Sequence, residues 1–249
     1  MPINDRKAQI LEVVTKKRSA TVQELKEELG VSESTIRRDI ATLNREGKLI
    51  KVHGGAVALD EIPSAGELSV LAKESMNREE KLRIAEYAAS LIIPGDYVYL
   101  DSGTTTEYMT GYIKEKNATY VTNAVAHAKD LVRKGLKVLL IGGELKENTE
   151  AIVGADAILH IQKYHFTKGF FGTNGVNMKL GYTTPDVREA LIKRVAIENT
   201  MAGQRYILAD HDKFGKSSAV TFADFGGTVI LTDKYPGDLY SKVAEVKVV

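Results

Sequence analysis

The sequence contains no cysteine, and no stretch of it approaches the roughly 18 consecutive apolar residues that a membrane-spanning helix requires. The absence of cysteine excludes disulfides, thiolate metal ligands and cysteine nucleophiles, and it suits a reducing compartment. The first residues, MPINDRKAQILEVVTKKRS, are charged and amphipathic and lack the apolar core of a signal peptide. These absences predict a cytoplasmic protein that has no membrane partner.

Charge of one sign is also scarce, because 34 Lys and Arg residues stand against 33 Asp and Glu residues, for a net charge of +1. With 249 residues, 43% hydrophobic and 27% charged, the chain has the composition of a soluble globular protein and the length for two domains. Residues 1–58 hold 11 basic and 8 acidic residues, a balance of +3 that leaves −2 for the remainder. The basic end hints at a polyanionic partner.

Two helices are predicted near the start of the chain. In DRKAQILEVVTKK the apolar residues recur at helical spacing between charges. TVQELKEEL follows, in which Thr21 is a candidate N-cap and Glu24, three residues later, has the spacing of a capping box. Gly30 then ends the second helix.

A third helix follows, and either Ser32 or Ser34 can cap it. Its inward positions, spaced at i, i+4 and i+7, are Ile36, Ile40 and Leu43. Its opposite arc then carries Thr35, Arg37, Arg38 and Asp39. Most arginine pairs of this kind are a solvated helix face, so the two arginines alone do not decide a function.

After the third helix, KLIKV and AVAL flank HGG and predict two short strands joined by a tight turn. Helix, helix, turn, helix and hairpin is the order of a winged helix-turn-helix, whose second motif helix enters the major groove of DNA. This arrangement predicts DNA contacts from the helix and the wing. The predicted contact residues are Ser32, Ser34, Thr35, Arg37, Arg38, Lys48, Lys51, His53, Gly54 and Gly55.

The composition changes at residues 59–75, where Pro63, Ser64 and Gly66 interrupt any periodicity. This segment is predicted to be a linker between a winged-helix domain at 1–58 and a second domain at 76–249. The second domain begins with the helix NREEKLRIAEYAASLI, in which Asn77 and Glu80 have capping-box spacing. Strands and helices alternate after it, which predicts an α/β domain with a mostly parallel sheet covered by helices on both faces.

Short polar loops follow the predicted strands, where ligands of such sheets bind. The loop DSGTTT is the most informative, because Gly103 permits a tight turn and the hydroxyls and amides at the start of the next helix favour an anion such as phosphate. Lys213 is a candidate cation for the same anion. The alternative is that Ser102 or Thr104 only caps the helix and that Lys213 is a surface lysine.

No cofactor or metal site is predicted. FGKSS resembles the end of a P-loop, but Asp210 stands where that motif needs glycine, and no G-x-G-x-x-G follows a strand. The five histidines fall at no metal-binding spacing. His211, between Asp210 and Asp212, is the one histidine considered as a possible ligand contact.

The stretch VSESTIRRDIATLNREGKLIKVHGGAV resembles the N-terminal signature of the DeoR family of bacterial transcriptional regulators. The second domain resembles the effector domain of that family in LDSGTTT, VTN, IGGELKENTEAIVG, FFGTNGV, YTTPDVREALIKR and LADHDKFGKSS. The resemblance implies a fold similar to ribose-5-phosphate isomerase and a phosphorylated sugar as effector, usually one that relieves repression. By the same resemblance, the ligand-binding residues are Asp101, Ser102, Gly103, Thr104, Thr105, Thr106, Asn123, Gly143, Asn174, Lys193, Asp210 and Lys213.

The kinship with an isomerase keeps open an alternative, an enzyme that isomerises sugar phosphates. Such a reaction needs a positioned carboxylate base. Isomerases of that type carry an acid-rich loop, and the comparable loop here, GTNG, has Thr173 and Asn174 in place of the carboxylates. The other candidate bases are Asp101, Glu144, Glu189 and Asp210. A winged helix has no use in such an enzyme, so the expectation is a regulator.

The partners expected of the regulator are double-stranded operator DNA, a sugar phosphate and a second copy of the chain. A single reading helix buries too little surface for selective binding, so a homodimer or homotetramer is predicted. LDSGTTTEYMTGYI resembles the fructose-operon repressors of Gram-positive bacteria, which makes fructose 1-phosphate the first candidate effector. Tagatose 6-phosphate and deoxyribose 5-phosphate remain competitors.

Overall fold

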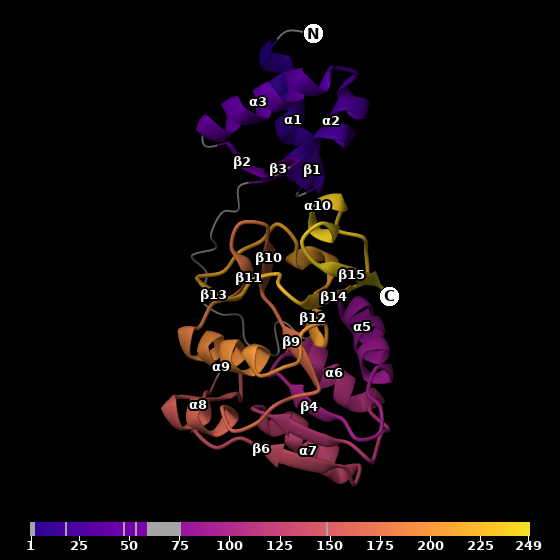
Figure 1. The fold of residues 1–249 in the computed structure, drawn as a ribbon, viewed down its shortest axis with the longest axis vertical. Helices are drawn as coiled ribbons and strands as arrows, with labels where there is room; N and C mark the ends of the chain where they lie inside the picture. Colours follow the sequence, from indigo (N-terminus) through magenta and orange to yellow (C-terminus); the bar gives the residue numbers. More distant parts are fainter. Residues whose placement is uncertain (1–2, 18, 47, 53, 59–75, 148) are drawn as a thin grey trace.

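The computed structural model describes residues 3–17, 19–46, 48–52, 54–58, 76–147 and 149–249, and Figure 1 shows their arrangement. The predicted linker at 59–75 lies outside the described residues. Within the described part, no helix is long and apolar enough to cross a membrane.

The N-terminal part folds around its own apolar core. Its elements are α1 (Ile3–Lys17), β1 (Ser19–Thr21), α2 (Val22–Leu29), α3 (Glu33–Arg45), β2 (Leu49–Val52) and β3 (Gly55–Ala58). The strands form an antiparallel sheet in the order β1, β3, β2, which leaves β2 and β3 as the predicted hairpin. Ile10, Leu25 and Ile36 join the three helices in a core in which each is fully buried.

The capping box predicted for α2 is confirmed. The Thr21 hydroxyl accepts a hydrogen bond from the Glu24 amide, and the Glu24 carboxylate accepts one from the Thr21 amide. Gly30 follows with a φ of +63°, so it ends the helix in a left-handed conformation that glycine adopts without strain. The order of helices and strands is the predicted winged helix-turn-helix.

A seven-stranded sheet forms the centre of the C-terminal part, and all its neighbouring strands are parallel. In spatial order the strands are β15 (Glu245–Val248), β14 (Thr228–Thr232), β12 (Arg205–Leu208), β9 (Lys168–Gly172), β4 (Tyr97–Leu100), β5 (Thr119–Thr122) and β6 (Lys137–Leu140). The helices are α5 (Arg78–Ser90), α6 (Thr104–Tyr112), α7 (Val125–Arg133), α8 (Ala155–Ile161), α9 (Val187–Glu198) and α10 (Asp238–Ser241). This confirms the predicted α/β fold.

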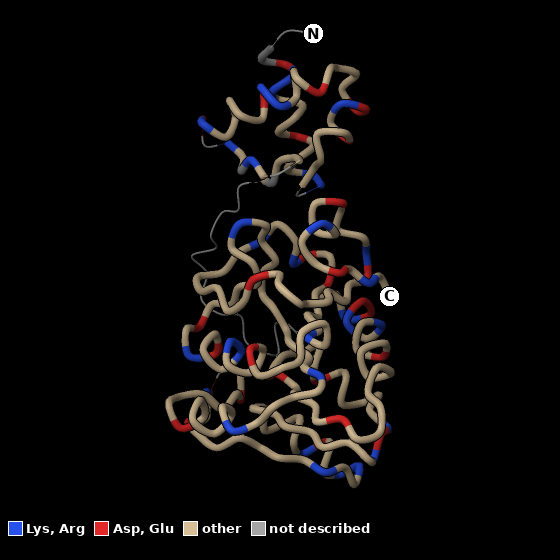
Figure 2. Tube along the Cα trace, viewed as in Figure 1, with Lys and Arg blue, Asp and Glu red and all other residues tan. Residues whose placement is uncertain are grey.

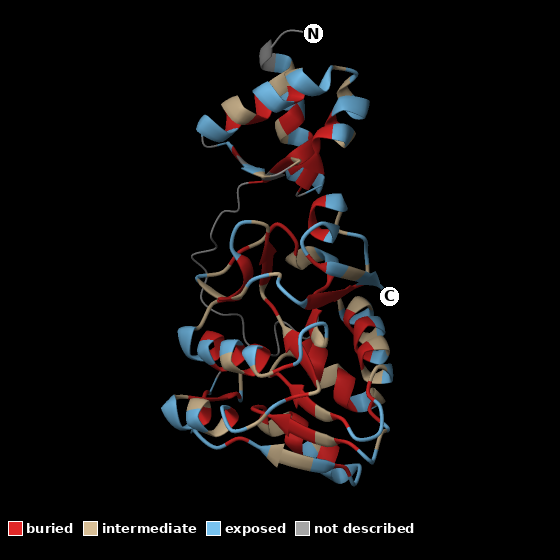
Figure 3. Cartoon of the chain, in the orientation of Figure 1, coloured by how far each residue is buried: buried red, intermediate tan, exposed pale blue. Residues whose placement is uncertain are grey.

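Two apolar clusters fill the two faces of this sheet. Val98 and Leu100 of β4 belong to the cluster with α5 and α6, whereas Tyr99 between them belongs to the cluster with α8 and α9. Successive side chains of a strand point to opposite faces, so β4 contributes to both cores. Figure 3 shows the central strands buried between helices whose outer faces are exposed.

Several smaller elements were not predicted. A second antiparallel sheet joins β10 (Gly175–Asn177), β11 (Gly181–Thr184) and β13 (Val220–Ala223), and a hairpin joins β7 (Glu144–Leu145) and β8 (Ile152–Val153). A 3-10 helix, η1 (His211–Lys213), follows β12. These pieces are two to four residues long, too short to show a period in the sequence.

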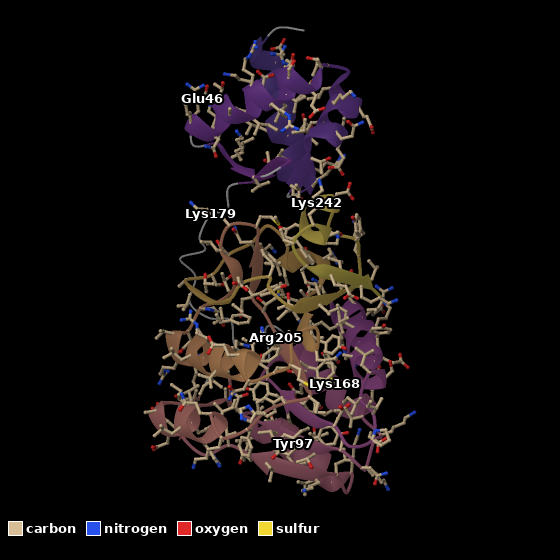
Figure 4. All side chains as sticks on the ribbon, viewed as in Figure 1. Glu46, Tyr97, Lys168, Lys179, Arg205 and Lys242 are labelled. Atoms are coloured by element: carbon tan, nitrogen blue, oxygen red, sulfur yellow. The ribbon has the colours of Figure 1, made fainter. Side chains whose placement is uncertain are left out.

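The two parts of the chain meet at α10 and β1, which are adjacent in Figure 1. Lys242, labelled in Figure 4, comes directly after α10, and its Nζ lies near the Gly54 turn. The same junction brings the Ser19 hydroxyl close to Gly237. The winged helix therefore rests on the end of the sheet where β14 and β15 lie.

Candidate functional site

Helix α3 presents to solvent most of the polar residues that the sequence predicts for DNA contact. Ser32 caps the helix, since its hydroxyl accepts a hydrogen bond from the Thr35 amide at 3.3 Å. Arg37 and Arg38 are exposed, as is Ser34. The opposite side of the helix is anchored in the core by Ile36, Ile40 and Leu43.

Asp39 does not share that exposed arc, and the prediction that it would is wrong. Asp39 is 4% exposed, and its carboxylate accepts hydrogen bonds from Arg6 Nε at 2.5 Å and Nη2 at 3.3 Å. Helix α1 contacts α3, so Arg6 reaches position 39 at the edge of the buried stripe. The pair fixes the position of α3 against α1.

Arg37 lies beside Glu33, one helical turn earlier, and its Nε and Nη2 donate to Glu33 Oε1 at 3.0 and 2.5 Å. Both side chains are at least half exposed, at 57% and 50%. Exposed pairs of this kind contribute only about 0–1 kcal/mol, so a phosphate or a guanine edge can replace Glu33 at little cost. Figure 2 shows Lys and Arg mixed with Asp and Glu over both parts of the chain. Among the described residues, no basic face therefore marks α3 as a candidate DNA-contact helix, and that assignment depends on its local geometry.

The two lysines predicted for the wing are exposed. Lys48 forms an ion pair with Glu46 at 2.9 Å, and the Lys51 amide donates to Asn44 Oδ1 at the end of α3. This places both lysines beside the C-terminal end of α3. His53, the third predicted polar wing residue, lies outside the described residues.

The two wing glycines form a turn that packs inward. Gly54 has a φ of +85°, and its carbonyl accepts a hydrogen bond from the Val22 amide. A Cβ at Gly55 would lie 2.3 Å from the carbonyl oxygen of Ala20, so β3 can approach β1 only with glycine at this position. Packing against β1 accounts for Gly55, which is buried.

The DSGTTT loop connects β4 to α6, at the carboxyl end of the central strand. Gly103 is the N-cap of α6 and, among the described residues, no side chain caps that helix. The alternative that Ser102 or Thr104 caps it is therefore wrong. The first-turn amides of α6, from Thr104 onward, have no partners within the helix, and the helix dipole adds partial positive charge there. An anion fits this end of α6.

Hydrogen bonds inside the fold hold the loop in place. Thr106 Oγ1 donates to the carbonyl oxygen of Asp101 at 2.6 Å and lies 2.8 Å from that of Gly103. Asn123, at the end of β5, accepts from the Ser102 amide and from the Tyr99 hydroxyl, both at 3.1 Å. These two predicted ligand residues position the loop, and Asn123 does so with almost no exposed surface.

Asp101 and Lys193 form a buried ion pair next to the loop. Asp101 Oδ2 also accepts from the Gly172 amide at 3.0 Å, and Lys193 Nζ donates to the Gly172 carbonyl at 3.1 Å. Burial raises the pKa of Asp101, and the charge of Lys193 opposes that rise. Asp101 Oδ1 is buried without a hydrogen-bond partner among the described residues, so it is an acceptor available to a ligand hydroxyl.

Helix α9 adds a second set of charges that the sequence did not assign to the ligand site. Glu189 is buried one turn before Lys193, and its Oε1 accepts from Lys146 at 3.0 Å and from the Thr149 hydroxyl at 2.7 Å. Its negative charge contributes to the raised pKa of Asp101. The sequence signal for the buried charges of α9 is their spacing: Glu189 and Lys193 stand four positions apart among the core residues of the helix.

Lys146 also contacts the start of α9. Its Nζ lies 3.0 Å from Asp186, the N-cap residue, whose side chain accepts from the amides of Arg188 and Glu189. Burial alone would raise the pKa of Asp186, but these hydrogen bonds outweigh it and hold the value at about 2. Asp186 therefore remains charged and fixes Lys146 on α9.

Two other predicted ligand residues have structural explanations in the second sheet and the hairpin. The Asn174 side chain accepts a hydrogen bond from the Thr184 hydroxyl at 3.2 Å. Gly143 has a φ of +148°, and a Cβ there would lie 2.7 Å from the Val153 carbonyl oxygen. Glycine at 143 therefore permits the close approach of β8.

Asp210 is the N-cap of η1, after β12, and Lys213 is the last residue of that 3-10 helix. Asp210 is 2% exposed, and its Oδ2 lies 3.9 Å from Lys213 Nζ. Its Oδ1 accepts a hydrogen bond from Asn77 Nδ2 at 3.0 Å, a partner that the sequence did not predict. His211 is held by Asp233, whose Oδ1 and Oδ2 each lie 2.7 Å from a nitrogen of the histidine.

His127 lies at the start of α7, buried beneath the DSGTTT loop. Burial lowers the pKa of its ring to about 4, although a hydrogen bond with the Gly103 backbone favours the protonated form. Its Nδ1 has no hydrogen-bond partner among the described residues. The ring is neutral at pH 7 and supports the loop without adding charge to it.

Known proteins resemble this chain along nearly its whole length. A model of the DeoR C terminal sensor domain matches residues 76–234, and one of the DeoR-like helix-turn-helix domain matches residues 6–62. FruR of Bacillus subtilis (strain 168), an uncharacterized HTH-type transcriptional regulator, is 43% identical over 244 residues, which cover 96% of each chain. A lactose phosphotransferase system repressor of Staphylococcus aureus is 34% identical over 247 residues, 98% of this chain and 96% of that protein.

Among solved structures, ribose 5 phosphate isomerase A from Neisseria gonorrhoeae matches with a TM-score of 0.40 and 14% identity, over 54% of this chain and 52% of that one. The full-length sorbitol operon regulator SorC from Klebsiella pneumoniae matches with a TM-score of 0.38 and 10% identity, over 86% of this chain and 97% of that one.

Proposed function

The chain belongs to the DeoR family of bacterial transcriptional regulators, and on that premise we propose that it represses a sugar-utilisation operon and leaves its operator when a phosphorylated sugar binds. It is a regulator and not a sugar-phosphate isomerase, since its helix-turn-helix domain and its similar relatives are those of transcriptional regulators. In agreement with this, the GTNG loop offers no carboxylate, and the Thr173 hydroxyl is bonded to the Gly175 carbonyl.

The DNA half of the proposal is supported by the capped, anchored α3. Its exposed Arg37 and Arg38 extend from a helix whose other side is buried, which is the arrangement needed to enter a major groove. Arginine there reads guanine with two hydrogen bonds, and Ser32, Ser34 and the wing lysines reach the backbone phosphates. One helix buries little surface, so we propose that a dimer, or a dimer of dimers, binds repeated half-sites.

The effector half is carried by one observation, the uncapped start of α6 beside the buried Asp101 Oδ1. The free first-turn amides favour a phosphate, and the carboxylate oxygen accepts a sugar hydroxyl, so the two groups together select a phosphorylated sugar. Lys213, on the loop after β12, is the candidate cation for the phosphate; β12 is separated from β4 by β9 alone. The proposed ligand site is the predicted set with Glu189 and Lys146 added.

Fructose 1-phosphate is the first candidate effector, because LDSGTTTEYMTGYI resembles fructose-operon repressors and FruR of B. subtilis is 43% identical to this chain. Tagatose 6-phosphate and deoxyribose 5-phosphate are the competing candidates. The residues that face the sugar hydroxyls decide among these compounds, and Asp101 and Asp210 are the carboxylates placed for that selection.

Protection mapping on DNA from upstream of the protein's own operon tests the regulator proposal. We expect a footprint with repeated half-sites separated by whole turns of the double helix, at a salt concentration where unrelated DNA is unprotected. Sedimentation of the free protein should give a dimer or a tetramer. A folded protein that protects no upstream DNA in preference to unrelated DNA would contradict the proposal.

A further inference from the structure

Asn77 connects the start of the C-terminal domain to the loop that carries Asp210. Its Nδ2 donates hydrogen bonds to Asp210 Oδ1 at 3.0 Å and to Asp212 Oδ2 at 2.9 Å. One amide group thus bridges two carboxylates that stand on either side of His211. Asn77 lies two positions after the predicted linker and directly before α5.

The bridge determines how α5 begins. Asn77 is the N-cap of α5, but it has a φ of +48° and makes no side-chain capping bond, so the predicted capping box with Glu80 is wrong. Outside glycine, the left-handed conformation is adopted most readily by Asn and Asp, which explains why this side chain can stand here. The amide that would cap the helix is instead committed to Asp210 and Asp212.

Asp210 is the member of the bridge that belongs to the proposed ligand site. Its buried Oδ1 accepts from Asn77 and from the Asp212 amide, and its Oδ2 lies near Lys213. A sugar phosphate that attracts Lys213 and donates a hydroxyl to Asp210 therefore competes for the same carboxylate that Asn77 holds. The Asn77 hydrogen bond also lowers the pKa of Asp212, which favours the charged form of that carboxylate.

The opposite side of this loop faces the winged helix. A cavity of about 510 Å³ lies between the two parts of the chain. From the C-terminal part it is lined by His211, Asp212 and Phe214, and from the winged helix by Lys16, Lys17 and Ser19. The loop from Asp210 to Phe214 thus carries Asp210 of the proposed ligand site, is bonded to Asn77 at the start of α5, and lines the same cavity as the winged helix.

We propose that Asn77 is the residue that couples the ligand site to the DNA-binding domain, by holding Asp210 and Asp212 in the arrangement that favours operator binding. Binding of a sugar phosphate favours the arrangement in which the Asn77 bridge is open. The start of α5 is then released from the loop. This inference rests on the proposed function, because it names how that same ligand site is regulated.

Reciprocity gives the proposal a signature that a purely structural role lacks. If Asn77 stabilises the DNA-binding arrangement, its loss shifts the protein toward the ligand-binding arrangement, so sugar phosphate binds more tightly and operator DNA more weakly. If Asn77 only supported the shape of the ligand site, its loss would weaken sugar phosphate binding. The coupling role and the purely structural role therefore predict opposite changes in the affinity for sugar phosphate.

Asn77→Gly is the variant of choice, because glycine keeps the left-handed backbone without strain while removing the amide. Asn117→Gly, at an exposed loop position outside both sites, is the matched control. Operator and sugar phosphate dissociation constants are measured for full-length wild type and both variants by anisotropy and calorimetry. For Asn77→Gly we expect operator binding to weaken and sugar phosphate binding to tighten, each by on the order of tenfold.

Asn77→Asp is the second variant, since it suits the same backbone but places a third carboxylate against Asp210 and Asp212. It should shift both constants in the same directions and at least as far as Asn77→Gly. Unchanged constants, or weaker sugar phosphate binding in folded variants, would overturn the proposal for Asn77. Absence of selective operator binding by the wild type would instead overturn the proposed function, so the two failures are distinguishable.

Discussion

Lys193 of α9 donates to the carboxylate of Asp101 at the end of β4, in an ion pair that is almost entirely buried. The pair joins the helix layer to the central strand at the point where the DSGTTT loop begins. Gly172 of β9 bonds to both partners, so three neighbouring elements meet there. The geometry of the proposed ligand site therefore depends on a pair of charges inside the fold.

Lys193→Met should destabilise the protein by about 3–5 kcal/mol, because it leaves the buried Asp101 without its counter-charge. Asp101→Asn in the same background removes that charge, so the double variant should be more stable than Lys193→Met alone. Urea unfolding of the two single variants and the double variant measures the coupling. Strictly additive losses would contradict the inference that the two charges depend on each other.

Arg37→Ala should weaken operator binding by about 1–3 kcal/mol and leave sugar phosphate affinity unchanged, because Arg37 extends from the exposed arc of α3. Arg133→Ala, an exposed arginine on α7 with its own acidic neighbour, is the control. Anisotropy with labelled operator DNA at fixed salt gives the operator affinities of the two variants, and calorimetric titration gives their sugar phosphate affinities. Wild-type operator affinity in Arg37→Ala would remove this residue from the reading surface.

Lys213→Gln should weaken binding of the sugar phosphate by roughly tenfold while changing the affinity for the free sugar little, since its cation is assigned to the phosphate. Lys179→Gln, in the exposed turn between β10 and β11 and labelled in Figure 4, removes the same charge away from the site. Calorimetric titration of each variant with both compounds is the measurement. An equal loss for the free sugar would assign Lys213 to the sugar ring.

His127 predicts a pH dependence of stability. Its pKa is about 4 in the folded protein and about 6.5 when unfolded, so between these values the unfolded state binds the proton and the folded state does not. Stability from this group is therefore complete above pH 6.5 and falls by about 3 kcal/mol as the pH drops to 4. Urea unfolding of His127→Leu should lose this component, whereas the exposed His165→Gln should retain it. An unchanged pH profile in His127→Leu would contradict the assignment.

The sequence predicted the parts of the fold that repeat a pattern. The capping box of Thr21 and Glu24, the apolar stripe of α3 and the alternation of strands and helices all follow from local chemistry or from period, and each is present. The order of the seven strands depends on pairing between distant segments, which the spacing of apolar residues along the sequence does not reveal. It places β9 beside β4 and so brings Gly172 to Asp101.

Residues that depend on a distant partner were predicted least well. Asp39 was expected on the exposed arc because the helical period alone cannot reveal Arg6, 33 positions earlier. Asn77 has the spacing of a capping box, but two carboxylates more than 130 positions later take its amide. Glu189 and Lys146 were not assigned to the proposed ligand site for the same reason, since only folding brings the residues after β7 to α9.

The central claim is tested most directly by anisotropy of labelled DNA from upstream of the protein's own operon, bound to the protein at fixed salt and titrated with sugar phosphates and their free sugars. We predict that one sugar phosphate, with fructose 1-phosphate first in line, releases the DNA, while its unphosphorylated counterpart does not. Release by the free sugar at the same concentration, or selective DNA binding that no sugar phosphate affects, would contradict the assignment of the DSGTTT loop as the phosphate site of a sugar-responsive repressor.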